Sequence, residues 1–130
     1  MYRAVTRNIE VTVTPRFLPD RSSPENNHYF WAYTIEISNL GSETVQLKTR
    51  AWHITDALGR EQDVRGAGVV GEEPILGPGE SFEYTSGVPL QTPSGFMSGS
   101  YGMITEDGEQ FDVEIPAFSL DSPVGVRTIN

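Results

Sequence analysis

The chain has 130 residues and a formal net charge of −9, and it contains no cysteine. This length is typical of one domain and is sufficient for a hydrophobic core without disulfides. The lack of cysteine excludes disulfides, thiolate nucleophiles and cysteine-ligated zinc. No apolar run approaches the ~20 residues of a membrane span, and the start of the chain lacks the apolar segment of a signal peptide. We therefore expect one domain over residues 1–130, in the cytoplasm and without a membrane partner.

The charge is distributed unevenly along the chain. Residues 1–65 carry eight Lys/Arg and eight Asp/Glu, whereas residues 66–130 carry one Lys/Arg and ten Asp/Glu. A surface that binds duplex nucleic acid needs clustered cations, and this chain has too few, so we expect no nucleic-acid partner. An anionic ligand would have to use cations of the first half, which are Lys48, Arg50, Arg60 and Arg65.

Alternating apolar residues predict the first strands. Ile9, Val11 and Val13 alternate with polar residues and indicate a strand, and the proline-containing segment 15–27 is expected to be a loop. The clearest strand covers residues 29–38, where the odd positions are apolar and predicted to point into the core. Phe30 and Trp31 are consecutive and face opposite sides, so we expect one of them to be partly exposed.

In the next predicted strand, which begins near Val45, the apolar residues switch from odd to even positions. Val45 and Leu47 are apolar at odd positions, whereas Trp52 and Ile54 are apolar at even positions. Because successive side chains of a strand point to opposite faces, this switch predicts a β-bulge, or a strand buried on different faces at its two ends. Residues 56–59 then predict a hairpin turn into a strand at 61–64.

The second half contains strands separated by glycine-rich segments. Residues 66–80 and 87–99 are expected to be long connections, and alternation predicts strands around Phe82, around Tyr101 and around Val113. Asp107-Gly108 predicts a tight hairpin between the last two strands. Seven or eight short strands with regular turns are typical of an antiparallel β-sandwich. The predicted core includes Trp31, Tyr33, Ile35, Phe82, Tyr84, Tyr101 and Met103.

Three stretches of the sequence are distinctive, and they are RAWHITD (50–56), GAGVVGEEP (66–74) with LGPGE (76–80) and FEYTSG (82–87), and TPSGFMSGSY (92–101) followed by IPAFSL (115–120). In this order and spacing they resemble the ApaG family over about residues 3–127. The resemblance implies a bacterial protein with a fibronectin type III-like β-sandwich and no agreed enzymatic activity. The family is loosely associated with cobalt and magnesium tolerance. Similar eukaryotic domains in F-box proteins and a polymerase-interacting protein look like recognition modules. Glu73 stands where many relatives carry Gln.

The glycine motif Gly66-x-Gly68-x-x-Gly71 offers a candidate ligand site. In dinucleotide-binding folds such glycines precede a helix whose N-terminus holds the phosphates. Here Glu72, Glu73 and Pro74 follow, so no helix is expected, and a structural connection is favoured over a phosphate site. The alternative is that these glycines, with Arg50 and Arg65, bind a small phosphate compound or nucleotide.

Catalytic and metal sites have no clear signature. The chain has only two histidines and no cysteine, and it lacks a Gly-x-Ser-x-Gly elbow. We therefore expect no enzymatic activity, no cofactor and no metal. The favoured function is a non-catalytic binding module for a protein partner. The sequence leaves open the identity of that partner and the oligomeric state of the chain.

Overall fold

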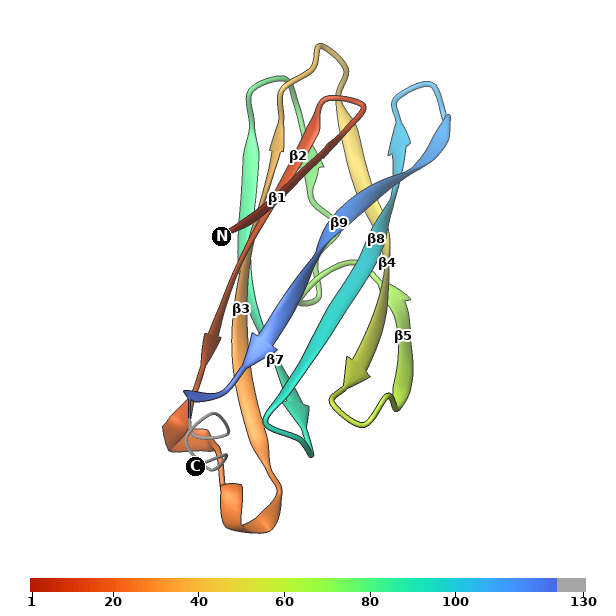
Figure 1. The fold of residues 1–130 in the computed structure, drawn as a ribbon. Coiled ribbons are helices and arrows are strands. Elements are labelled where there is room, and N and C mark those ends of the chain that lie inside the picture. The colour runs from red at the N-terminus through yellow and green to blue at the C-terminus, as the bar shows by residue number, and fades with distance from the viewer. Residues whose placement is uncertain (124–130) are drawn as a thin grey trace.

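Two antiparallel sheets pack face to face in a computed structural model that describes residues 1–123 (Figure 1). The first sheet has the order β1-β2-β3-β7, and the second has the order β5-β4-β8-β9, with β6 paired to β4. The strands are β1 Tyr2–Thr6, β2 Ile9–Phe17, β3 Tyr29–Asn39, β4 Val45–Asp56, β5 Glu61–Ala67, β6 Ile75–Leu76, β7 Ser81–Leu90, β8 Ser94–Thr105 and β9 Gln110–Asp121. Two short 3-10 turns, η1 Pro19–Arg21 and η2 Pro24–Asn26, precede β3. The prediction of an all-β, fibronectin type III-like sandwich is confirmed.

The inward faces of the two sheets form the core. Six of the seven predicted core residues are buried, and they are Trp31, Tyr33, Ile35, Tyr84, Tyr101 and Met103. The prediction that Phe82 is a core residue is wrong, because its side chain is only half-buried and packs at the margin of the core. It lies on β7, which pairs with β3 on one side only. Phe30 is half-buried while Trp31 is buried, which confirms that one of these two rings is partly exposed.

Several strand boundaries differ from the sequence prediction. The prediction omitted β1, ended β2 too early, and treated 87–99 as a long connection, whereas β7 and β8 leave only residues 91–93 between them. Pro15 is tolerated because β1 pairs only with residues 9–13, so β2 has no partner on that side at Pro15. Gly87 lies within β7 beside the ring of Phe30, where a Cβ atom would come within 2.7 Å of the ring.

The parity switch in β4 arises from a bulge at Lys48. The pairing of β4 with β8 shifts between Leu47 and Thr49, which leaves Lys48 without an opposite residue. Leu47 and Trp52 therefore both point into the core, as the bulge prediction required. The hairpin prediction at Asp107-Gly108 is also confirmed, since β8 and β9 pair on either side of this turn.

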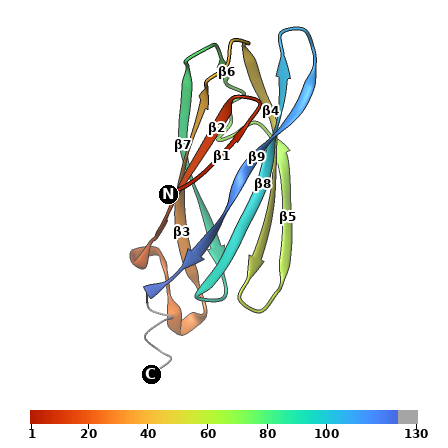
Figure 2. The same ribbon diagram turned by 45° about the horizontal axis from the view of Figure 1, so that its top comes forward.

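The two edges of the sandwich differ. On one edge β1 and β2 approach β9 (Figure 2). There the Tyr2 hydroxyl lies 3.1 Å from the Ser119 hydroxyl. On the other edge the terminal strands are β7 and β5, and each pairs with one neighbour, β3 and β4 respectively. Within residues 1–123 the structure has no helix with the length and hydropathy of a membrane span. Residues 124–130 lie outside the described residues, so one domain over 1–130 stays a prediction.

Candidate functional site

A groove runs along the sandwich between the edge strands β5 and β7. It is formed by one cavity of about 500 Å³ and a second of about 480 Å³. Ile54, Gln62 and Pro89 line both cavities, so the two adjoin. We call the two adjoining cavities together the edge groove. Its first part lies beside the turn that follows β5, and its second part reaches Arg60 and Gln91.

Aromatic side chains form the floor of the first part of the groove. Tyr33, Trp52 and Tyr84 all line it, and the rings of Tyr33 and Trp52 meet edge to face with centroids 5.3 Å apart. Burial raises the pKa of Tyr33 above its ordinary value, and it also raises the pKa of Tyr84. Both phenols are therefore neutral at physiological pH, and the floor presents hydroxyl groups without charge.

Arg50 is the one charged residue that lines the first part of the groove. It lies on β4 opposite Gly66 of β5, and its Nη1 donates hydrogen bonds to the carbonyls of Ala67 (2.9 Å) and Gly68 (2.8 Å). A Cβ atom at position 66 would come within 2.8 Å of the guanidinium, so Gly66 makes room for it. Among residues 1–123, no carboxylate lies within ion-pair distance of Arg50.

The glycine motif forms a strand end and a tight turn. Val69 and Glu72 exchange two backbone hydrogen bonds of 2.8 and 2.9 Å, and Gly71 within this turn has a φ of +81°. Gly68 has a φ of +63°, and a Cβ atom there would lie 2.3 Å from the carbonyl oxygen of Glu72. A left-handed backbone and close backbone contact favour glycine. No helix follows the motif, so the turn lacks the helix N-terminus that holds phosphates in dinucleotide-binding folds.

The predicted site residues divide between two faces of the second sheet. Arg50 and Gly71 line the groove, and Gly66 and Gly68 lie beside them at the turn. Arg65 pairs with Ala51, one position along the strand, so its exposed side chain points to the outer face, away from Arg50. These two cations therefore do not face one ligand together. Whether any of these residues binds a phosphate stays a prediction.

The other two cations named from the sequence are paired. Lys48 lies 2.6 Å from Glu73, and Arg60 lies 2.6 Å from Asp56. Glu73 is therefore paired with the cation at the bulge. Of the four cations, Arg50 is the one that combines a place in a cavity with the lack of a described carboxylate partner.

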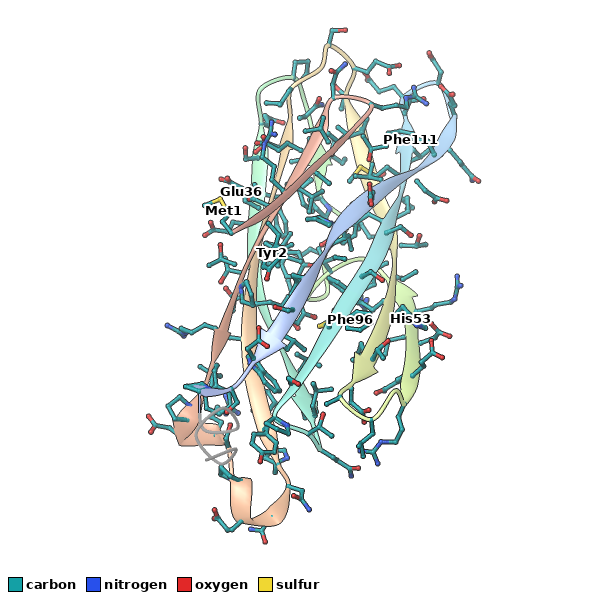
Figure 3. The ribbon with its side chains drawn as sticks, viewed as in Figure 1. Met1, Tyr2, Glu36, His53, Phe96 and Phe111 are labelled. Atoms are coloured by element: carbon teal, nitrogen blue, oxygen red, sulfur yellow. The ribbon has the colours of Figure 1, made fainter. Side chains whose placement is uncertain are left out.

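On the outer face of the second sheet, His53 bridges two carboxylates. Its Nδ1 lies 2.7 Å from Asp63 and its Nε2 lies 2.7 Å from Glu61 (Figure 3). These hydrogen bonds raise the pKa of His53. Phe96 on β8 also faces outward, with 49% of its surface exposed. In the described part of the chain no group of three or more His, Asp and Glu residues has the arrangement of a metal site.

Comparison with known proteins establishes the family. The family model described as the ApaG domain matches residues 19–105. The chain belongs to the ApaG family. It is 68% identical over 130 residues to Protein ApaG of Rhodopseudomonas palustris and to Protein ApaG of Afipia carboxidovorans, with all of each chain covered.

Solved structures of ApaG-type proteins share the architecture. The putative ApaA protein from Bordetella pertussis superposes with a TM-score of 0.86 at 50% identity, covering 88% of this chain and 94% of that one. The C-terminal domain of wzt gives a TM-score of 0.55 at 12% identity, a likeness of fold alone. The family expectation from the three sequence stretches is therefore confirmed.

Sequence reasoning did not find the groove itself. Tyr33 and Tyr84 are predicted as core residues, which is correct for their burial but omits the cavity that they line together with Trp52. Gln62 and Ser86 carry no motif, and nothing in the order of the residues marks them as groove residues. Gln62 and Ser86 become groove residues only because β5 and β7 are separated in the folded structure.

Proposed function

We propose that this ApaG-family protein is a non-catalytic binding module that holds an extended segment of a partner protein in the edge groove. The observation that carries the proposal is that two cavities adjoin between the terminal strands of the two sheets and share three lining residues. A small compact ligand would fill one of these cavities, whereas a strand-like peptide can lie along both. The seven residues of β5 extend roughly 3.3 Å each, which suits a peptide of about six residues.

The walls of the groove suit a peptide in a second way. Among residues 1–123, β5 pairs only with β4 and β7 only with β3, so each has one edge that is not used in the sheet. Edge strands offer backbone N–H and C=O groups to an added strand, and side chains of the added strand alternate into the neighbouring pockets. The aromatic floor would accept apolar side chains of such a peptide.

The first part of the groove favours binding over catalysis, whereas the titratable residues His28, Asp56, Arg60 and Glu61 line the second part. A nucleophile with an adjacent base, or a pair of carboxylates with separate roles, is the usual arrangement for hydrolysis or acyl transfer. Arg50 is the one charged residue in the first part of the groove. Tyr33 and Tyr84 are neutral there, because burial raises the pKa of both phenols. The alternative function, phosphate or nucleotide binding by the glycine motif, remains a hypothesis without a supporting feature at the turn.

Two tryptophan substitutions on the same strand test the proposal. Gln62→Trp places a large ring in the groove, while Arg65→Trp places the same ring on the outer face of β5. Peptides that bind the wild-type protein are selected from a random heptapeptide display library and remeasured with both variants. We expect Gln62→Trp to abolish binding and Arg65→Trp to retain it. A third variant, Phe96→Ser, examines the outer face of the second sheet. Binding that survives Gln62→Trp but is lost in Phe96→Ser would reject the groove and place the partner on that outer face.

A further inference from the structure

We infer that the edge groove recognises the C-terminus of its partner and that Arg50 binds the terminal carboxylate. This inference rests on the proposed function and adds the chemical group that the groove selects. It follows from the charge of the groove lining, from the way the Arg50 guanidinium is held, and from the position of the turn that follows β5.

The charge of the lining points to an anionic group on the ligand. Arg50 is the one charged residue among those that line the first part of the groove, and the rest are apolar or neutral polar. The chain as a whole carries a net charge of −9, so its overall field does not attract anions. Attraction of an anion must therefore come from a local contact, and Arg50 provides it beside the aromatic floor of Tyr33, Trp52 and Tyr84.

The guanidinium of Arg50 is held in place by backbone groups. Its Nη1 donates to the carbonyls of Ala67 and Gly68, and Gly66 leaves space for the planar group to lie across β5. Arginine carries five N–H groups, of which Nη1 has two. The three on Nη2 and Nε have no hydrogen-bond acceptor within residues 1–123. A carboxylate accepts two parallel N–H bonds from a guanidinium, which matches the free donors.

The turn after β5 favours a chain end over an internal acidic residue. Val69, Val70 and Gly71 of this turn line the groove at its Arg50 end. In Figure 1 the chain that leaves β5 crosses from the second sheet toward the first. Because this turn also lines the cavity and accepts a hydrogen bond from Arg50 through Gly68, we expect it to close that end of the groove. Away from Arg50, the groove continues to Arg60 and Gln91. A peptide that enters from the Arg60 end would stop at the turn, with its last carboxylate at Arg50.

The test compares two peptide libraries that differ in one group. Random heptapeptide mixtures are synthesised with a free C-terminal carboxylate or with a C-terminal carboxamide, and each is passed over the immobilised full chain. Retained peptides are quantified and sequenced by mass spectrometry. The variants are Arg50→Gln, Gly66→Ala and, as a matched control on the opposite face, Arg65→Gln. Gly66→Ala keeps the charge of Arg50 but displaces its guanidinium, which is the end of a flexible side chain. Thermal unfolding confirms that each variant is folded.

We expect the wild-type chain and Arg65→Gln to retain the carboxylate library at least roughly tenfold better than the carboxamide library, because a charge-assisted pair is lost in the amide. Arg50→Gln and Gly66→Ala should lose this preference. Equal retention of the two libraries, with retention still abolished by Gln62→Trp, would overturn the role of Arg50 and leave the groove as the peptide site. A preference for internal Glu or Asp in the carboxamide library that depends on Arg50 would overturn the chain-end assignment.

A second probe separates this inference from the proposed function. N-acetyl-L-valine and its carboxamide are titrated into ¹⁵N-labelled protein while the Arg50 Nε–H resonance is followed. A shift with the carboxylate alone supports the carboxylate site even if no heptapeptide is retained, in which case the extended-peptide function fails. The lack of any shift at Arg50 at saturating concentration, together with equal library retention, contradicts the inference.

Discussion

The phenol oxygens of Tyr84 on β7 and Tyr101 on β8 lie 2.5 Å apart, and this hydrogen bond joins the two sheets beneath the edge groove. Tyr84 lines the groove, whereas Tyr101 is fully buried behind it. Burial raises the pKa of both phenols far above the ordinary value, so both stay protonated and each can donate or accept. The position of the groove floor is therefore tied to the core of the sandwich by one polar contact.

Removing one of these hydroxyls should destabilise the fold. Tyr84→Phe leaves the Tyr101 hydroxyl buried without its partner, and a lone buried polar group costs about 1–3 kcal/mol. We expect a similar loss for Tyr101→Phe, and a loss for the double variant that is smaller than the sum of the single losses. Urea unfolding of the three variants measures these free energies. Additive losses would show that the two hydroxyls do not stabilise each other.

The core and most of the sheet architecture could be predicted because alternation reports directly which side of a strand is buried. The clearest case is β4, where the change from Leu47 to Trp52 requires one extra residue, and the bulge at Lys48 supplies it. The predicted strand boundaries were wrong where proline or glycine, which usually marks a connection, lies inside a strand. The predicted connections begin at Pro15 and Gly87, but Pro15 lies in β2 where β1 no longer pairs with it, and Gly87 lies in β7 where it accommodates the Phe30 ring.

The candidate site was less accessible from the sequence. Arg50 and the glycine motif were singled out together, and the register places Arg50 opposite Gly66. Arg65 is predicted to act together with Arg50 in the alternative phosphate site, yet successive residues of a strand face opposite sides of the sheet, so Arg65 points away from Arg50. The groove depends on the separation of β5 and β7, which are distant in the chain and belong to different sheets. No local sequence pattern predicts that separation.

The turn of the glycine motif allows a matched pair of substitutions. Gly68→Ala introduces a Cβ atom 2.3 Å from the Glu72 carbonyl oxygen at a φ of +63°. Gly71→Ala meets the same kind of backbone strain, at a φ of +81°, but no atom lies within 4 Å of the new Cβ. We expect a loss of about 2–4 kcal/mol for Gly68→Ala and about 1 kcal/mol for Gly71→Ala, from strain alone. The comparison is made by chemical denaturation without ligand. Equal losses would mean that the turn relaxes around position 68.

Removal of divalent cations should leave the protein unchanged. The chain has no cysteine, and residues 1–123 contain no cluster of three or more ligating side chains in a metal-binding arrangement. Because a structural metal contributes its binding free energy to folding, its removal would lower the melting temperature strongly. We expect identical melting temperatures, within measurement error, for protein dialysed against EDTA and for protein dialysed against buffer alone. A fall that Mg²⁺ or Co²⁺ reverses would establish a structural cation.

The last prediction concerns the bridge of His53 between Asp63 and Glu61 on the outer face of the second sheet. The imidazole nitrogens lie 2.7 Å from a carboxylate oxygen on each side, and both ring nitrogens can donate only when the ring is protonated. The hydrogen bond to Asp63 contributes most to raising the pKa of His53 above 6.5, and the one to Glu61 comes next. A raised pKa in the folded state means that the bridge contributes its full stability below the unfolded value and loses it as pH rises through the folded value. We expect the His53 ring resonance in an NMR titration to report a midpoint above 6.5, and Asp63→Asn to lower that midpoint. Glu61→Gln should lower it less, because its hydrogen bond has the smaller effect. A midpoint that neither substitution moves would show that the exposed bridge is not populated in solution.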